Sequence, residues 1–227
     1  MSGKNERSPG QYARERYRRG LHSYRRRMRG PVLFLAGPII VAVIALAAWR
    51  DTNPWWFFAG GMVGGTVMAA MYTLDPPQHI ANWGVGEKGE RRTAKTLRPL
   101  LRSGWTVEHD IQRRYENFDH VLVGPPGVFL LETKVRIGTL SVEEGALTIR
   151  YWDDPDEVIT LPHLRAQMLR RAKALRATHQ FKRSVRRWVT PVVVIWGHFP
   201  DRFVEDGGVI YIHGDDLVEW LRPLPSA

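Results

Sequence analysis

Two stretches without a single charged side chain constrain this sequence more than any other feature. They cover residues 31–49 and 54–74, and only four residues separate them. A helix rises about 1.5 Å per residue, so some 20 residues cross a hydrocarbon core of about 30 Å. Helices buried in a protein core seldom lack every charge over such a length. We therefore expect a transmembrane helical hairpin over residues 31–74.

The charge at the amino terminus predicts how this hairpin is oriented. Residues 1–30 hold ten Lys or Arg and two Glu, a net charge of +8 out of +10 for all 227 residues. So basic a segment, with few apolar side chains, is expected to be disordered, and it is too long for a cleaved signal peptide. Basic flanks stay in the cytoplasm, whereas the neutral turn at Arg50 and Asp51 is easily translocated. We expect a protein of the cytoplasmic membrane with both termini in the cytoplasm.

Two further features concern partners of this amino-terminal part. The basic segment is suited to anionic lipid headgroups or to nucleic acid, and it can also serve only to set topology; we favour topology together with lipid contact. Gly60 and Gly64 are spaced to let another helix approach closely, either the first span or a second copy of the chain. The sequence does not choose between an internal contact and a homo-oligomer.

The remaining residues predict one α/β domain at 83–227, after a linker at 75–82. The absence of cysteine excludes disulfides, thiolate metal sites and a thiol nucleophile. Hydrophobic periodicity, capping residues and turn residues predict alternating helices and strands, and thus a mixed sheet flanked by helices. The expected helices cover residues 82–102, 162–186 and 215–221, the expected strands cover 105–110, 118–123, 128–135, 189–196 and 209–213, and a further hairpin covers 140–151.

The hairpin around residues 124–127 carries the most specific chemistry. If Val123 pairs with Val128 across a four-residue Gly-Pro-Pro-Gly loop, the numbers of paired residues sum to 251, and Asp119 lies opposite Glu132. Side chains alternate along a strand, so Lys134 shares their face. Carboxylates among apolar residues need compensation, and two of them suit a Mg²⁺ ion that keeps open positions for phosphate oxygens. An exposed Glu-Lys charge pair is the alternative, against which the apolar runs on both strands argue.

A carboxylate on the preceding helix extends this site. Glu90 begins the apolar stripe that continues with Ala94, Leu97 and Leu101, which is an unusual place for an acid. It could complete the metal shell, while Lys134 orients an attacking water or stabilises charge on the reacting phosphate. Phosphodiester hydrolysis fits these parts.

Four short motifs follow one another in this region: Gly-Glu-Lys-Gly-Glu at 86–90, Phe-Asp-His-Val-Leu-Val-Gly-Pro at 118–125, Gly-Val-Phe at 127–129 and Glu-Thr-Lys at 132–134. Their ordered combination resembles a known family, the nuclease-related domain NERD of the PD-(D/E)XK nuclease superfamily. The resemblance implies a restriction-endonuclease-like core. It also implies that Glu90, Asp119 and Glu132 bind the metal, that Lys134 assists catalysis, and that Gln167 matches a glutamine of the family near the same site.

Three functions stay open at this point. The first is Mg²⁺-dependent hydrolysis of DNA, with Mn²⁺ as a substitute, by a membrane-tethered enzyme. The second is a noncatalytic module that keeps the nuclease fold and binds nucleic acid or a partner, and the third is a membrane-anchored structural element. A basic stretch suits nucleic-acid phosphates in the first two, although a solvated helix face is the commoner explanation; its members are Arg165, Arg170, Arg171, Lys173, Arg176, Lys182, Arg183, Arg186 and Arg187.

Overall fold

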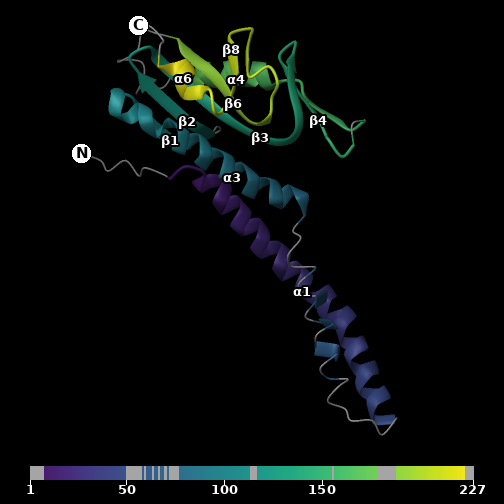
Figure 1. Ribbon diagram of the computed structural model, residues 1–227. Helices are drawn as coiled ribbons and strands as arrows, with labels where there is room; N and C mark the ends of the chain where they lie inside the picture. Colours follow the sequence, from purple (N-terminus) through teal and green to yellow (C-terminus); the bar gives the residue numbers. More distant parts are fainter. Residues whose placement is uncertain are drawn as a thin grey trace, which may run out of the picture. The chain divides into compact units, whose positions relative to one another are not determined.

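A computed structural model describes residues 8–49, 58, 60–62, 64, 65, 67, 68, 71, 77–112, 117–154, 156–177 and 188–222. Figure 1 shows the elements in chain order: helices come first, five consecutive strands follow, and then come α4, three more strands and α6. The helices are α1 (Gln11–Trp49), α3 (Gln78–Leu97), η1 (Arg98–Ser103), α4 (Leu164–Arg176) and α6 (Leu217–Leu221), and the strands are β1 (Thr106–Gln112), β2 (Asn117–Gly124), β3 (Gly127–Glu143), β4 (Ala146–Arg150), β5 (Val158–Leu161), β6 (Val189–His198), β7 (Phe203–Asp206) and β8 (Val209–His213).

One eight-stranded mixed sheet organises the carboxyl-terminal part. Its main path runs β1-β2-β3-β6-β8-β7, and β4 and β5 branch from the far half of β3. The pairs β3-β6 and β6-β8 are parallel, and the other pairs are antiparallel. Parallel neighbours need a crossover, and α4 supplies it between β3 and β6. The predicted mixed α/β architecture is therefore confirmed.

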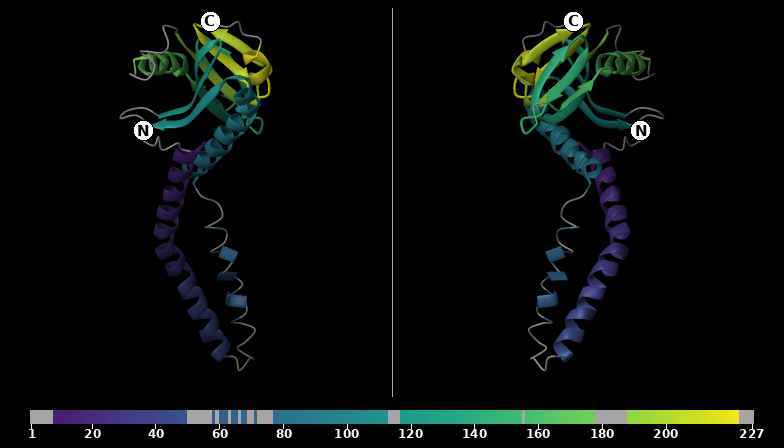
Figure 2. Two further views of the ribbon diagram at one scale, coloured as in Figure 1. Left: turned by 90° about the vertical axis from the view of Figure 1, so that its left-hand side faces the viewer. Right: turned by 90° about the vertical axis from the view of Figure 1, so that its right-hand side faces the viewer.

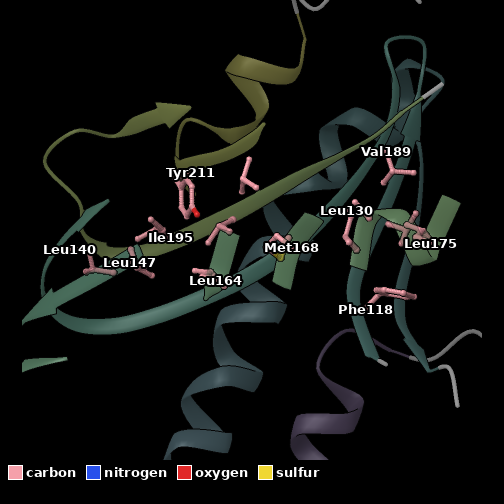
Figure 3. Packing of buried hydrophobic residues seen from close by; sticks show 14 of the residues in the cluster. Phe118, Leu130, Leu140, Leu147, Leu164, Met168, Leu175, Val189, Ile195 and Tyr211 are labelled. Carbon is pink, nitrogen blue, oxygen red and sulfur yellow. The ribbon is translucent and has the colours of Figure 1, made fainter. Parts of the chain in front are cut away.

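Helices cover both faces of this sheet, as Figure 2 shows for α4 and α6 on opposite sides. On one face α4 buries a stripe of apolar side chains against β3, β6 and β8, and Figure 3 shows how closely they pack around Met168. On the other face η1 and α6 contribute Leu100, Leu217 and Leu221 to a second cluster, which includes Trp196 of β6. Burial on both faces explains why the central strands read as continuous apolar runs.

The structure corrects several predicted boundaries. β2 and β3 pair as far as Gly124 and Gly127, so the turn holds two residues where four were expected. The predicted helix over 82–102 ends as α3 at Leu97 and continues as the 3₁₀ turn η1. Because a 3₁₀ turn repeats every three residues, Leu100 is buried, whereas Leu101, predicted on the apolar stripe, is half exposed. Strands β5 and β7, of four residues each, were not predicted.

The predicted disorder of residues 1–30 differs from the structure, in which residues 11–30 belong to α1. Arginine favours helix almost as much as alanine does, and the start of α1 is capped locally. The backbone N–H of Ser8 donates to the Gln11 side chain, and the N–H of Gln11 donates to the Ser8 carbonyl. This Ser-x-x-Gln pattern is half of a capping box, so composition alone gave the wrong expectation.

The chain divides into two compact units, residues 14–84 and residues 1–13 with 85–227. In the first unit the Arg16 guanidinium lies 5.7 Å from the centre of the Trp83 ring. Among the described residues, no helix is both long and apolar enough to cross a membrane. Most side chains of residues 31–49 and 54–74 lie outside the description, so the hairpin stays a prediction.

Candidate active site

The register of the β2-β3 hairpin agrees with the pairing expected from the sequence. Each pair from His120 with Leu131 to Gly124 with Gly127 has numbers that sum to 251. The next position along both strands places Asp119 beside Glu132. Side chains alternate along a strand, so Asp119 points to the same face as Val121, and Glu132 to the same face as Leu130. Val121 and Leu130 both belong to the hydrophobic cluster under α4. The two acids therefore share the face that α4 covers.

Glu132 is the centre of a charged cluster on that face. Its Oε1 accepts a hydrogen bond of 2.7 Å from Lys134 Nζ, and its Oε2 accepts one from Arg171 of α4. Glu132 is only 9% exposed. Burial raises the pKa of Glu132, but the charges and hydrogen bonds of Lys134 and Arg171 outweigh it and hold that pKa below its ordinary value. Glu132 is an anion held between two cations.

Asp119 is placed by the backbone of the neighbouring strand. Its Oδ2 accepts a 2.9 Å hydrogen bond from the backbone N–H of Thr133. Burial raises the pKa of Asp119 to about 7, with the Glu132 charge adding to the rise; the Thr133 N–H, Lys134 and Arg171 counter it in part. A carboxyl group with this pKa is poised to gain or lose a proton near neutrality.

Glu90 reaches the same electrostatic environment from α3. The preceding residue, Gly89, allows the helix to pack closely, because a Cβ there would lie 2.1 Å from Val135 Cγ2. Burial, together with the charges of Asp119, Asp110 and Glu132, raises the pKa of Glu90 to about 9, although one hydrogen bond from the Gly10 backbone acts in the opposite direction. Four carboxyl groups thus influence one another, and a cation near them would relieve the repulsion.

Asp110 is a further acid beside this site, and the sequence predicted it only as the last residue of a strand. Pairs on either side of it, His109 with His120 and Ile111 with Phe118, put Asp110 in register with Asp119. Its backbone is left-handed, with φ of 49°, and its side chain is 2% exposed. One carboxylate oxygen accepts a 2.7 Å hydrogen bond from the Tyr12 N–H, and the other has no partner among the described residues. Strained backbone and a buried orphan oxygen are typical of functional positions.

A histidine pair lies beside these acids on the neighbouring strands. The Nδ1 atoms of His109 and His120 are 2.8 Å apart. Burial, together with the nearby His109, lowers the pKa of His120 to about 3, so this imidazole is neutral at physiological pH. His120 is two residues from Leu122 on β2 and so points to the same face, which is the one opposite α4. The alternation of side chains along β2 therefore points His120 away from Asp119.

The helix α4 brings a different residue to the site from the one predicted. Gln167 is exposed, whereas Arg171, one turn later on the same side of the helix, contacts Glu132 and the Asn117 carbonyl. The periodicity of α4 could have indicated Arg171, because it follows the buried Met168 by three residues and precedes the buried Leu175 by four. Its partner on β3 could not be read from the sequence.

The basic residues of this helix do not form one free surface. Arg165 pairs with Asp206 at 2.8 Å, and the Arg176 guanidinium lies 5.7 Å from the centre of the Trp188 ring. Arg170 and Lys173 are exposed. Lys182, Arg183, Arg186 and Arg187 lie outside the described residues. The predicted phosphate-binding stretch is therefore represented in the structure by a few exposed cations on α4.

The donor set fits a divalent cation only in part. No three His, Asp or Glu side chains within the described ranges lie together so as to hold a metal ion. Glu90, Asp119 and Glu132 are thus not assembled as a three-ligand group, because both oxygens of Glu132 face Lys134 and Arg171. Two adjacent carboxylates are nevertheless what Mg²⁺ commonly takes from a protein, with water and substrate phosphate completing its shell.

Comparison with known families supports this reading of the motifs. The family model of the nuclease-related domain matches residues 85–196, from the middle of α3 to β6. Residues 85–196 form a NERD domain. Its span contains Glu90, Asp119, Glu132 and Lys134, as well as Arg171. No curated protein and no solved structure matches the chain significantly.

Proposed function

We propose that this protein is a membrane-tethered, Mg²⁺-dependent enzyme that hydrolyses phosphodiester bonds of DNA. The observation that carries the proposal is the meeting of Asp119, Glu132 and Lys134 on one face of the β2-β3 hairpin. The match to the nuclease-related domain supports the same chemistry. The restriction-endonuclease-like form of the core is part of this proposal.

Each side chain has a distinct task in this scheme. Asp119 and Glu132 hold the metal, with Glu90 as a further ligand or an acid beside it, and Mn²⁺ can replace Mg²⁺. The bound ion supplies charge stabilisation and a more acidic water. Lys134, fixed at 2.7 Å from Glu132, orients that water or stabilises charge on the phosphate. The Thr133 N–H keeps Asp119 aimed at its neighbour.

The tether and the partners are proposed on the sequence and on one surface feature. The charge-free stretches at 31–49 and 54–74 support a hairpin in the cytoplasmic membrane with both termini inside. Arg16 and Arg19 line a hollow of about 370 Å³ together with Trp83, which suits an anionic lipid headgroup. A Cβ added at Gly60 or Gly64 meets nothing within 4 Å among the described residues, which suits a helix of a second copy.

A cleavage assay with the full-length protein in mild detergent tests the enzymatic proposal. Linear, single-stranded and branched DNA are incubated with Mg²⁺ or Mn²⁺, and with a chelator as the blank. Asp119→Asn and Lys134→Ala are expected to cleave about 100-fold more slowly or worse, as expected when a metal ligand or an acid-base group is lost. Lys95→Ala, at an exposed position of α3, serves as the control and should cleave like wild type.

One observation favours a second candidate, a noncatalytic module that binds nucleic acid or a partner. Lys134 and Arg171 already neutralise Glu132, and no three-ligand group is assembled in the described part of the chain. This candidate predicts that DNA binds with the same affinity in Mg²⁺ and in chelator and is never cut. Cleavage that disappears in Asp119→Asn would exclude it.

A further inference from the structure

Arg171 is placed too firmly to be an incidental surface cation. Its side chain is only 11% exposed. Nη1 donates to Glu132 Oε2 and Nη2 donates to the Asn117 carbonyl, so the planar guanidinium bridges β2 and β3. Met168 and Leu175, both fully buried on α4, anchor the helix on either side of it. The packing of the core therefore directs this guanidinium at the acid pair.

Arg171 is one of two cations that contact Glu132. Lys134 alone neutralises Glu132, and it does so through the other carboxylate oxygen. The Arg171 guanidinium carries five N–H donors in a planar fork, and its contacts with Glu132 and the Asn117 carbonyl use two of them. A guanidinium fork is well matched to two oxygens of a phosphate group.

The contact also explains why the carboxylates are not assembled around an ion. Oε2 of Glu132 faces Arg171, whereas a divalent cation shared with Asp119 would need a Glu132 oxygen of its own. A divalent cation and the guanidinium cannot share the same oxygen, Oε2, because their positive charges would repel each other strongly at such short range and low dielectric. Arg171 therefore occupies the position of the counter-ion in the metal-free protein.

We propose that Arg171 is the phosphate-binding arginine of the site. In the metal-free protein it holds Glu132, and on loading it gives up Oε2 to the divalent cation and binds a non-bridging oxygen of the phosphodiester instead. This inference rests on the proposed function and adds the residue that recognises the scissile phosphate. It makes two predictions of opposite sign, because removing Arg171 frees a metal ligand and deletes a substrate contact.

The test measures two affinities with the full-length protein in mild detergent. Arg171→Met keeps much of the apolar stem and removes the charged guanidinium, which lies 5.7 Å from the centre of the Phe118 ring; Arg171→Lys keeps a charge without the fork. Titration calorimetry with MnCl₂ alone gives the metal affinity. Fluorescence anisotropy with a labelled DNA oligonucleotide in Ca²⁺ gives the substrate affinity. Arg170→Ala is the matched control, since Arg170 is the exposed neighbour on the same helix.

Arg171→Met is expected to bind Mn²⁺ about tenfold more tightly and the oligonucleotide about tenfold more weakly, as a change of one nearby charge predicts. Arg171→Lys should recover part of the DNA affinity, and Arg170→Ala should leave Mn²⁺ affinity unchanged. Mn²⁺ binding that is equal or weaker in Arg171→Met would overturn the inference and leave Arg171 as a structural brace. An absence of Mn²⁺ uptake in wild type and in both Arg171 variants would overturn the metal-dependent function as well.

Discussion

At the residue scale, the two raised carboxyl pKa values make the metal-free protein sensitive to alkali. The pKa of Glu90 rises from 4.5 to about 9, and that of Asp119 from 3.8 to about 7, mainly through burial. Between the ordinary and the raised values the unfolded chain has lost a proton that the folded chain still holds. The folded state binds more protons there, so its stability falls as pH rises, by up to about 1.4 kcal/mol per pH unit for each group.

The substitution Glu90→Gln should remove much of this loss of folding stability at high pH. Its amide cannot ionise, so the unfolding temperature in chelator should fall less between pH 6 and pH 9 than in wild type. At pH 9 we expect the variant to melt higher by about 3 °C or more. Glu219→Gln, at an exposed position of α6, neutralises an equal charge away from the cluster. If the unfolding temperatures of wild type and Glu90→Gln fall equally with pH, the pKa of Glu90 is not raised in the folded protein.

At the scale of the element, the close approach of α3 to β3 depends on Gly89. A Cβ at this position would lie 2.1 Å from Val135 Cγ2 and 3.2 Å from Thr133 Cγ2. Gly89→Ala should therefore push α3 outward, destabilise the fold by on the order of 1–3 kcal/mol as overpacking does, and displace Glu90. Chemical denaturation measures the first effect, and the pH slope described for Glu90 measures the second.

Gly86→Ala is the internal comparison for this substitution. It lies one turn earlier in α3, and a Cβ there meets nothing within 4 Å. Alanine is a better helix former than glycine, so this variant should be equal to wild type or more stable by about 0.5–1 kcal/mol. If the two alanine variants have equal stability, the packing of α3 on β3 is looser than described.

The elements that sequence patterns predicted are those whose burial is strongest. The register of β2 and β3 followed from one tight turn and strict alternation, and β8 was predicted with its observed bounds, Val209–His213. β5 was missed because its side chains are largely exposed, and β7 because Phe203–Asp206 mixes apolar and acidic residues. Short edge strands carry little periodic signal.

The same reasoning explains which site residues were found. Asp119, Glu132 and Lys134 belong to one hairpin, so local spacing was enough to bring them together. Arg171 depends on how α4 packs against β3, and Asp110 depends on the β1-β2 register and on the chain near Tyr12. Contacts between segments so far apart in sequence leave no local pattern.

At the scale of the whole molecule, the membrane hairpin makes a prediction of its own. The full chain should stay with the membrane pellet after washing with alkaline carbonate. Val41→Arg with Val67→Arg should release it, since each arginine costs about 2.5–3.5 kcal/mol at the centre of a span. Both valines are exposed, at 65% and 52%, so the substitutions remove little packing within the described chain. Wild-type protein in the carbonate supernatant would rule out the proposed tether.

The hydrogen bond from the Tyr12 N–H to Asp110 has a consequence for truncated forms of this protein. A fragment that begins at residue 78 would keep all the candidate site residues. It would, however, lack the Tyr12 N–H, which donates to the buried carboxylate of Asp110. Such a fragment should behave differently from the full chain, with a poor yield or an altered dependence of stability on pH, for reasons unrelated to the lipid bilayer. Residues 8–13 belong to the same compact unit as residues 85–227, not to the unit formed by residues 14–84.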